Sequence, residues 1–204
     1  MNTNIKVDDI LIVIGNDKMS NNLANKIKRS EKKIKILKDK SLDLKKLIKL
    51  FTKSEQKSLI FFIISILNEA RRKNIRVKNI ESFKNKNELN LVLSKLNPKL
   101  ILVFRASLIF PKEIVENFEI INFHCADITD EMYRGLGAIY RSFKAKEKNP
   151  KVSAHKMVSK VDEGKIIFQS KYNFDFSKSY FYNENLAFQS GINAIIQYIK
   201  NIEK

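Results

Sequence analysis

The stretch NPKLILVFRASLIFPKEIVENFEIINFH, residues 97–124, contains two apolar runs separated by a polar segment. The first run, LILVF at 100–104, is apolar at every position, which is typical of a strand buried on both faces of a parallel sheet. Pro111 precedes KEIVENF, and proline is favoured in the first turn of a helix. The second run, IINFH at 120–124, is predicted to be another strand. The order strand, helix, strand predicts one unit of an α/β fold.

The same alternation continues on both sides of this stretch. ILIVI at 10–14 predicts a strand that ends at Gly15 and is followed by a helix over 21–29. We predict further strands at 33–37, 75–80, 152–158 and after a turn at 163–164, and further helices at 67–74, 85–97, 137–149 and 183–204. Residues 31–70 are the hardest to assign: KIKIL at 33–37 fits a strand, Leu42 to Phe51 fit a helical stripe, and LIFFII at 59–64 fits either a strand or a buried helix turn. The sequence therefore predicts a single doubly wound α/β domain over residues 1–204, with a mostly parallel sheet and helices on both faces.

Composition limits the classes of protein that remain. No apolar run reaches the roughly 18 residues that a membrane span needs, and the longest, SLIFFIISIL at 58–67, is about half that length. The first residues lack the features of a signal peptide, so a cytoplasmic protein is expected. Cys125 is the only cysteine, which excludes an intramolecular disulfide and a multi-cysteine zinc site. No metal site is predicted.

The chain is strongly basic, with 39 basic against 22 acidic residues and a formal net charge of +17. Such a balance raises the question of a nucleic-acid partner. However, the lysines are scattered, as in KIKRSEKKIKILKDK at 26–40, and no single segment interleaves aromatic with basic residues. We therefore predict no nucleic-acid partner, although positive charge would help to attract a phosphorylated substrate.

Polar residues with catalytic potential lie at the end of the strand predicted at 120–124. Asn122 and His124 are two positions apart, so on an extended chain both side chains lie on one face. Ligands of open α/β sheets bind beyond the carboxyl ends of the strands. Asp162, in the turn VDEG, is a carboxylate that the fold could bring to His124. An amide, an imidazole and a carboxylate suit acyl transfer to an amine. A hydrogen-bonded structural histidine is the alternative that these residues alone leave open.

Two segments together resemble the formyltransferases that use 10-formyltetrahydrofolate: NFHCADITDEMYRG at 122–135 and VSAHKMVSKVDEGKIIFQ at 152–169. That family shows Asn-x-His at the end of a central strand, then Tyr-Arg-Gly or Tyr-Pro-Gly, a strand carrying a histidine, and an Asp-x-Gly turn. It includes enzymes acting on glycinamide ribonucleotide, methionyl-tRNA and nucleotide-linked amino sugars. The resemblance covers roughly residues 96 to 170 and is only topological before them. The matching residues are Asn122, His124, Tyr133, Arg134, Gly135, His155, Asp162 and Gly164.

The resemblance implies roles for these residues. Asn122 would hold the formyl oxygen, His124 would stabilise the oxyanion, and Asp162 would keep His124 charged and assist proton removal. His155 would have a structural role and point away from the cleft. Two further groups of residues are implied: a donor site that hydrogen-bonds the pterin of 10-formyltetrahydrofolate through Ser107, Leu108, Ile109 and Val161, and an acceptor site at Gly15, Asn16 and Arg134. For Arg134, anchoring its own loop is an equal alternative.

This chain also departs from the family pattern. After His124 the family usually has a proline-containing loop, whereas here the loop is CADITDEM at 125–132, which is longer and acidic. Cys125 follows the histidine directly, but nothing in the sequence supplies it with a base, so we do not predict a nucleophile. GNDKMSNN at 15–22 keeps one glycine and lacks the glycine-rich phosphate loop of the glycinamide ribonucleotide enzymes.

The departures guide the choice of acceptor. The family's tRNA enzymes carry a second, C-terminal domain, and this sequence ends soon after the catalytic region, so tRNA is not the expected acceptor. Loss of the glycine-rich loop argues against glycinamide ribonucleotide. We expect a small primary amine, phosphorylated or nucleotide-linked, such as an amino sugar carried on a nucleotide. A formyltransferase-like module that binds without catalysis is the alternative. The choice between a monomer and a homodimer stays open.

Overall fold

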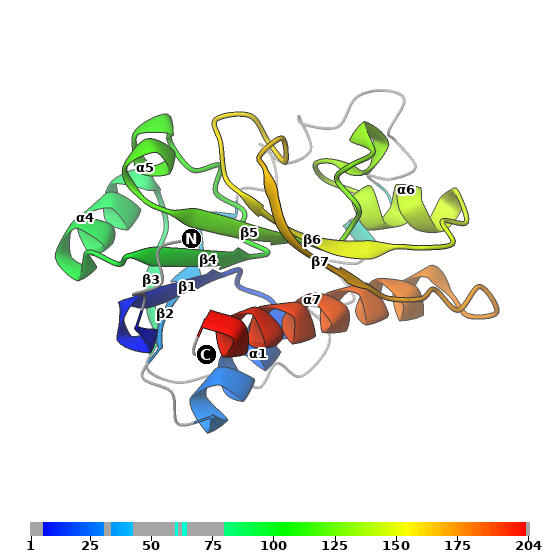
Figure 1. Cartoon of the computed structure of the whole chain (residues 1–204), viewed down its shortest axis with the longest axis horizontal. Coiled ribbons are helices and arrows are strands. Elements are labelled where there is room, and N and C mark those ends of the chain that lie inside the picture. The colour runs from blue at the N-terminus through cyan, green and yellow to red at the C-terminus, as the bar shows by residue number, and fades with distance from the viewer. Residues whose placement is uncertain (1–5, 31–33, 43–59, 61–62, 65–79, 203–204) are drawn as a thin grey trace.

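The computed structural model describes residues 6–30, 34–42, 60, 63–64 and 80–202. Its centre is a sheet whose described strands run in the order β3-β2-β1-β4-β5-β6-β7 (Figure 1). The bounds of these strands are β1 Ile10–Ile14, β2 Lys35–Asp39, β3 Glu81–Phe83, β4 Leu100–Phe104, β5 Ile120–His124, β6 Lys151–Lys156 and β7 Ile166–Lys171.

Most neighbouring strands are parallel. β3, β2, β1, β4 and β5 all pair in parallel, whereas β6 joins β5 antiparallel and β7 joins β6 antiparallel. The chain order reverses between β1 and β4, because β2 and β3 lie on one side of β1 and all later strands lie on the other. The prediction of a mostly parallel, doubly wound sheet is therefore confirmed.

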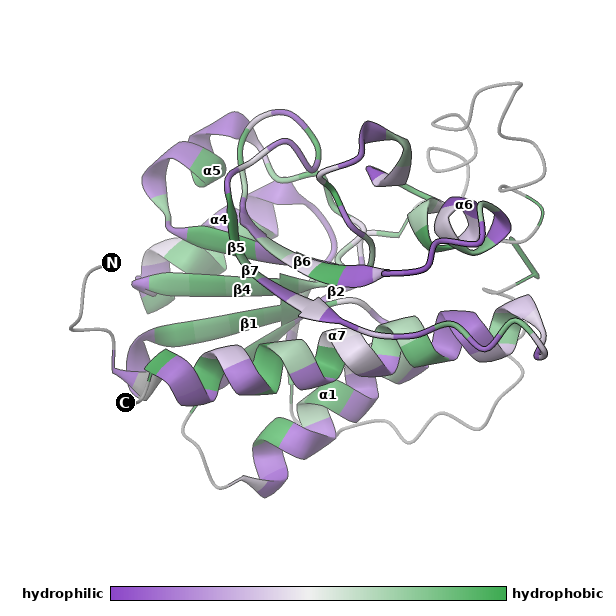
Figure 2. Ribbon diagram, turned by 45° about the vertical axis from the view of Figure 1, so that its right-hand side comes forward, coloured by the Kyte–Doolittle hydropathy of each residue, from purple (hydrophilic) through white to green (hydrophobic). Residues whose placement is uncertain are grey.

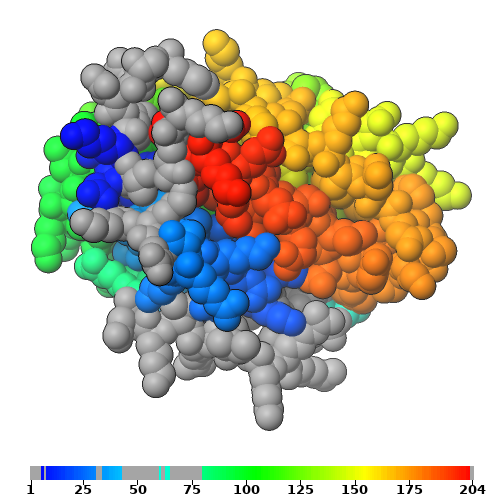
Figure 3. Space-filling model, turned by 60° about the horizontal axis from the view of Figure 1, so that its bottom comes forward, coloured from blue at the N-terminus to red at the C-terminus, as the bar shows by residue number. Residues whose placement is uncertain are grey.

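Helices cover both faces of the sheet. α1 and α7 pack on one face and α4 and α5 on the other (Figure 1), and α7 lies beside α1 on the molecular surface (Figure 3). None of the helices in the described part of the chain is long and apolar enough to cross a membrane. The bounds are α1 Lys18–Arg29, α4 Lys86–Leu96, α5 Lys112–Asn117, α6 Ala138–Lys144 and α7 Tyr180–Ile202, with short 3-10 turns η1 Val7–Asp9 and η3 Glu131–Tyr133.

The central strands are apolar along their whole length because both of their faces are buried (Figure 2). In β4, Leu100, Leu102 and Phe104 belong to the core cluster under α1 and α7. Ile101 and Val103 belong to the cluster under α4 and α5. A strand between two helical layers gains from an apolar side chain at every position, which explains why LILVF shows no alternation.

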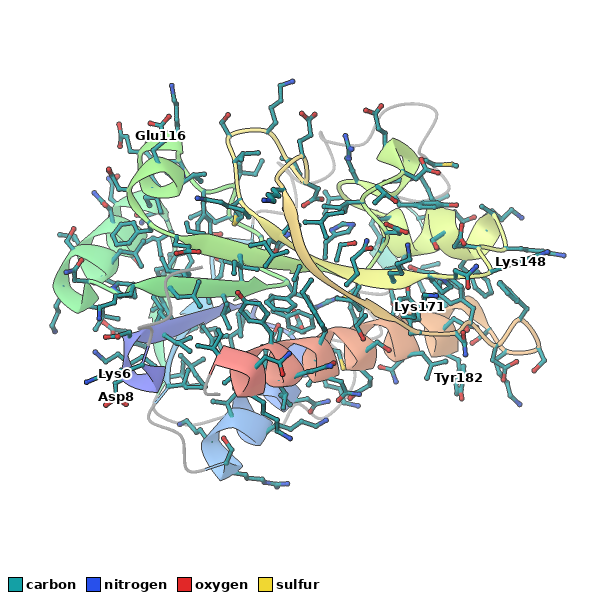
Figure 4. All side chains as sticks on the ribbon, viewed as in Figure 1. Lys6, Asp8, Glu116, Lys148, Lys171 and Tyr182 are labelled. Carbon is teal, nitrogen blue, oxygen red and sulfur yellow. The ribbon has the colours of Figure 1, made fainter. Side chains whose placement is uncertain are left out.

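The charged side chains labelled in Figure 4 lie at the periphery. Lys6, Glu116, Lys148 and Lys171 all project outward from the ribbon (Figure 4). This placement agrees with the interpretation of the scattered lysines as solvated residues, except for Lys38, which is buried.

Most predicted elements appear close to their expected bounds. The strand predicted at 33–37 is β2, shifted by two residues, and the last helix begins at Tyr180, three residues earlier than predicted. Most of the region 31–70 that the pattern left open, the helix predicted at 67–74 and nearly all of the strand predicted at 75–80 lie outside the described residues. The next described strand, β3, begins at Glu81.

Candidate active site

A cavity of about 860 Å³ opens at the carboxyl ends of the parallel strands. It lies at the point where the strand order reverses, between β1 and β4, which is where open α/β sheets bind ligands. Its walls come from the segments that follow β1, β4 and β5, from the connection between β6 and β7, and from α6 and α7. Asn122, His124 and Asp162 all line it.

Asp162 is the centre of a polar cluster in this cavity. Its Oδ2 lies 3.2 Å from His124 Nδ1 and accepts a hydrogen bond from the backbone N–H of Gly135 at 2.8 Å. Its Oδ1 lies 3.3 Å from Asn122 Nδ2, which donates to it. The structure thus brings together the three residues that the sequence singled out, although Asp162 is 40 positions from Asn122. Their catalytic roles stay predictions.

Asp162 is charged throughout the neutral range. Burial alone would raise the pKa of its carboxyl, but the hydrogen bond with His155, the nearby His124 and the N–H of Gly135 outweigh burial, so the pKa lies well below its usual value. The backbone of Asp162 is in the left-handed region, with φ 55°. Aspartate tolerates this conformation better than most residues do, because its short side chain can bond locally.

His124 has oxygen acceptors beside both ring nitrogens. Nδ1 faces Asp162, and Nε2 lies 2.8 Å from the carbonyl oxygen of Tyr133. Burial nevertheless lowers the pKa of His124 below its ordinary value, and Asp162 and Tyr133 only partly offset burial. The expectation that Asp162 keeps His124 charged stays a prediction; the nearby Asp162 acts in that direction, against the burial of the ring. Acceptors beside both nitrogens would stabilise a ring that carries two protons, so the site is suited to hold a proton gained during a reaction.

The expectation that His155 points away from the cleft is wrong. Its Nε2 lies 3.2 Å from Asp162 Oδ1 and 3.2 Å from Asn122 Nδ2, and its ring is 2% exposed. The reason is the antiparallel register of β6 on β5, which pairs His155 directly with Asn122. The carboxylate of Asp162 thus lies 3.2 Å from each of two imidazole rings, those of His124 and His155.

The depressed pKa of Asp162 makes the stability of the protein depend on pH. A carboxyl whose pKa is lower in the folded state contributes stability above its unfolded value, about 3.9, and loses it as pH falls below that value. We expect the difference in unfolding free energy between the natural protein and Asp162→Asn to shrink as pH falls from about 5 to about 3. Urea titrations at each pH would measure it. A difference that stays constant from about pH 5 to about pH 3 would contradict the depressed pKa of Asp162 in the folded protein.

The loop that departs from the family pattern is firmly held. Asp127 Oδ2 accepts from Lys151 Nζ at 2.6 Å, and its Oδ1 accepts from Gln169 Nε2 at 2.9 Å. Ser153 Oγ donates to the carbonyl oxygen of Ala126 at 2.9 Å. The acidic loop therefore docks on β6 and β7. No motif in the sequence indicated these contacts.

Two arginines fix the end of this loop. Arg134 Nε donates to the carbonyl oxygen of Ile128 at 3.1 Å, and its Nη1 lies 3.3 Å from Glu131 Oε1. These contacts agree with the anchoring alternative for Arg134, which also lines the cavity. Arg141, which the sequence analysis missed, is bonded to three backbone carbonyls of the same loop, those of Met132, Arg134 and Leu136. This frame holds Tyr133 and Gly135 against His124 and Asp162.

Cys125 is not suited to act as a nucleophile. The residue is buried, and burial raises the pKa of its thiol to about 12. The thiolate, which is the reactive form, is therefore almost absent at neutral pH. This agrees with the decision not to predict a nucleophile from the sequence.

The predicted donor-site residues line one side of the cavity. Ser107, Leu108, Ile109 and Val161 all contribute to its wall. Ile109 is 60% exposed and Val161 is 54% exposed. Large apolar side chains that stay exposed at the rim of a cavity are typical of a ligand site. The N–H groups of Ser107 and Leu108, however, donate to Asp39, a residue that the sequence analysis missed, so these two donors already have an acceptor.

The predicted acceptor residues have different places. Asn16 lines the cavity, but Gly15 does not. Gly15 N donates to the carbonyl oxygen of Phe104 at 3.1 Å, and a Cβ at Gly15 would collide with the carbonyl oxygen of Arg105. Glycine is therefore needed here because the chain after β1 touches the chain after β4.

An ion pair between Asp17 and Arg105 lies at the start of α1. Asp17 is the N-cap of this helix and accepts hydrogen bonds from the N–H and the hydroxyl of Ser20. Its Oδ2 also lies 2.9 Å from Arg105 Nε, and the guanidinium of Arg105 lies over the ring of Phe188 at 3.7 Å. Burial alone would raise the pKa of Asp17, but Arg105 and Ser20 outweigh burial and lower it. A carboxylate thus occupies the helix end that binds anions in many folds.

The remaining wall is formed by aromatic and carboxylate side chains of two helices. Tyr180, Glu184 and Phe188 are spaced four residues apart on α7 and all line the cavity, as does Tyr140 of α6. Tyr180 donates its hydroxyl hydrogen to Glu184 Oε1 at 2.8 Å. Aromatic rings and a carboxylate that accepts hydrogen bonds suit a hydroxylated ring, and Lys18, Lys40 and Arg134 line other parts of the same cavity.

Comparison with known proteins agrees with this geometry. Residues 8–180 match the sequence profile of a family described as formyl transferase. Among curated proteins no match was found.

Several solved structures share the fold. A sugar N-formyltransferase from a Shewanella species superposes with a TM-score of 0.59 at 16% identity, covering 95% of this chain and 69% of that one. A 4-N formyltransferase from Francisella tularensis has a TM-score of 0.64 at 16% identity, with 97% and 70% covered. A phosphoribosylglycinamide formyltransferase from Anaplasma phagocytophilum has a TM-score of 0.62 at 15% identity, with 90% and 80% covered.

Proposed function

The chain belongs to the formyl transferase family, a family of transferases, and on that premise we propose that it moves a formyl group from 10-formyltetrahydrofolate to the primary amine of a small molecule. The observation that carries this proposal is the convergence of Asn122, His124 and Asp162 in a cavity with an apolar rim. The sequence-based prediction of a transferase is confirmed at the level of the family.

The residues present fit the proposed donor. Ile109, Val161 and Val158 give an apolar rim for a flat ring system, and the carbonyl oxygens of residues 106–108 would accept hydrogen bonds from the amino and N–H groups of a pterin. When bound, the donor would supply an activated formyl carbon on a nitrogen leaving group.

The protein's own groups would do the rest. Asn122, through its side-chain amide, would donate to the formyl oxygen as negative charge develops there. His124 would take the proton that the attacking amine loses, and the charged ring would then be stabilised by Asp162 and by the carbonyl oxygen of Tyr133. Breaking the carbon–nitrogen bond of the donor would return a proton to its leaving nitrogen. Gain and loss of protons thus balance, with no metal required by the residues named.

For the acceptor we propose an amino sugar or a similar hydroxylated amine. The aromatic and carboxylate wall of α6 and α7 supports a sugar ring. The ion pair of Asp17 with Arg105 argues against a phosphate at the start of α1, because the helix end and the arginine already share a carboxylate. A nucleotide carried by the sugar would have to place its phosphates elsewhere on this basic protein.

The test is a spectroscopic assay of folate turnover with a panel of amines. It would offer free and nucleotide-linked amino sugars, glycinamide ribonucleotide and charged initiator tRNA, each beside its N-acetylated form as a control without a free amine. Turnover with an amino sugar alone supports the whole proposal, and turnover with glycinamide ribonucleotide or tRNA corrects the acceptor. Folate binding without turnover on any amine would favour a non-catalytic binding module. Absence of folate binding would end the proposal.

A further inference from the structure

Asp39 is a fully buried carboxylate outside the catalytic cluster. It is the last residue of β2, it is 0% exposed, and it is not among the residues that line the cavity. Buried carboxylates are rare unless several donors surround them. Its position therefore needs an explanation that the proposed chemistry does not give.

The side chain of Asp39 reaches the loop that follows β4. Its Oδ2 accepts from the N–H of Ser107 at 2.6 Å, from the N–H of Leu108 at 2.8 Å and from the hydroxyl of Ser107 at 3.0 Å. Its Oδ1 accepts from the N–H of Ser41 at 2.7 Å. Because β2 and β4 flank β1, the carboxylate spans the end of β1 and fixes a loop 68 residues away in sequence.

These bonds also set the direction of the loop carbonyls. In a trans peptide the C=O of one residue points opposite to the N–H of the next. With the N–H groups of Ser107 and Leu108 directed at Asp39, the carbonyls of Ala106 and Ser107 point away from it. Ala106, Ser107 and Leu108 line the cavity whereas Asp39 does not, so the loop lies between the carboxylate and the cavity. The carbonyls are thereby presented to a ligand edge that carries N–H donors.

We propose that Asp39 is a positioning residue for the formyl donor: it orients the backbone of residues 106–108 so that the carbonyls of Ala106 and Ser107 accept the N–H groups of the donor's heterocycle. This inference rests on the proposed function, since it concerns the donor side of the same cavity. It goes further by assigning donor affinity to a residue that never touches the donor. The acceptor side, at Asp17 and Glu184, is not involved.

Asp39→Asn is the informative variant, and Lys38→Met is its matched control. An asparagine keeps the shape, but its NH₂ group must face either Ser41 N–H or the two loop N–H groups, so a donor meets a donor. Lys38 is the preceding residue of the same strand, and its side chain lies on the opposite face, where Nζ donates to Asn21 Oδ1 at 2.6 Å. Lys38→Met removes a buried polar contact of β2 without touching the loop.

The probe is 5-formyltetrahydrofolate, which carries the same pterin with the formyl group on N5 and so is not a transfer substrate. We expect Asp39→Asn to raise the Kd for this probe by about tenfold or more. Lys38→Met should leave the Kd within about twofold of the natural value while lowering the Tm. In turnover, KM for the donor should rise while KM for the amine stays unchanged. A folded Asp39→Asn with unchanged Kd, or an equal loss in Lys38→Met, overturns the inference.

Hydrogen exchange separates this inference from the proposed function. In the natural protein the amides of Ser107 and Leu108 should be protected, and Asp39→Asn should release them. Fast exchange of both amides in the natural protein overturns the role of Asp39, and does so even if the variant fails to fold. Protected amides in a protein that binds no folate would instead refute the proposed function, and the donor role of Asp39 with it.

Discussion

Asp162→Asn should lower kcat on the order of 10³-fold while leaving the fold intact. Asparagine is well tolerated in the left-handed conformation that residue 162 adopts, so the backbone should not move. What changes is the charge between His124 and His155, and the acceptor for the N–H of Gly135. Without the negative charge of Asp162, the positively charged ring that His124 forms during the reaction loses one of its two stabilising partners. Single-turnover kinetics with saturating donor and amine would measure the loss.

Asp130→Asn is the matched control for this prediction. Asp130 accepts the N–H of Met132 as the N-cap of η3 and does not line the cavity, so its replacement removes the same charge outside the catalytic cluster. The kcat of the Asp130→Asn variant should stay within about twofold of the natural value, as is usual for a change away from a reacting group. If Asp162→Asn were as active as this control, Asp162 would have no part in the chemistry.

Gly164→Ala should destabilise the protein by about 3 kcal/mol or more. A Cβ at this position would collide with the carbonyl oxygen of Lys156 and stand 3.4 Å from His155 Nδ1. Backbone cannot move aside as a flexible side chain can, so the turn between β6 and β7 would have to open. Opening it would also displace Asp162, two residues away. Urea unfolding and the assay of turnover would both register the change.

Gly135→Ala tests the same kind of substitution without the collision. Gly135 has φ 72°, but a Cβ there would meet nothing within 4 Å. Its cost should therefore be limited to backbone strain, about 1 kcal/mol. Equal destabilisation of the two variants would show that the contact with Lys156 is not what requires a glycine at 164.

The sequence predicted well whatever depends on local pattern. The unbroken apolar run LILVF predicted a buried parallel strand, and in the structure helices do cover both of its faces. Asn122 and His124 share a face, as predicted, because side chains alternate along β5. The role of Asp162 did not follow from pattern at all. It came from the resemblance to a family, and the structure then placed it 3.2 Å from His124.

The features that the sequence did not predict depend on pairing between distant segments. His155 enters the cluster only because β6 is antiparallel to β5 in the register that pairs His155 with Asn122. A shift by one residue would turn its ring to the other face. Asp39 and Arg141 act through backbone groups of loops, and no side-chain motif marks such contacts in a sequence. Asp39 and Ser107, for example, are 68 positions apart.

The strand order also has a consequence for folding kinetics. The polar cluster is assembled within one continuous stretch, since Asn122 and Asp162 are 40 positions apart and β5, β6 and β7 are consecutive neighbours. β1, in contrast, must find β4 across some 90 positions, as the pairing of Ile10 with Leu100 requires. Loop closure over long separations slows folding. We therefore expect β5, β6 and β7, with the polar cluster they carry, to form first during refolding. The cavity also needs the end of β1, so it should be completed in the last and slowest step.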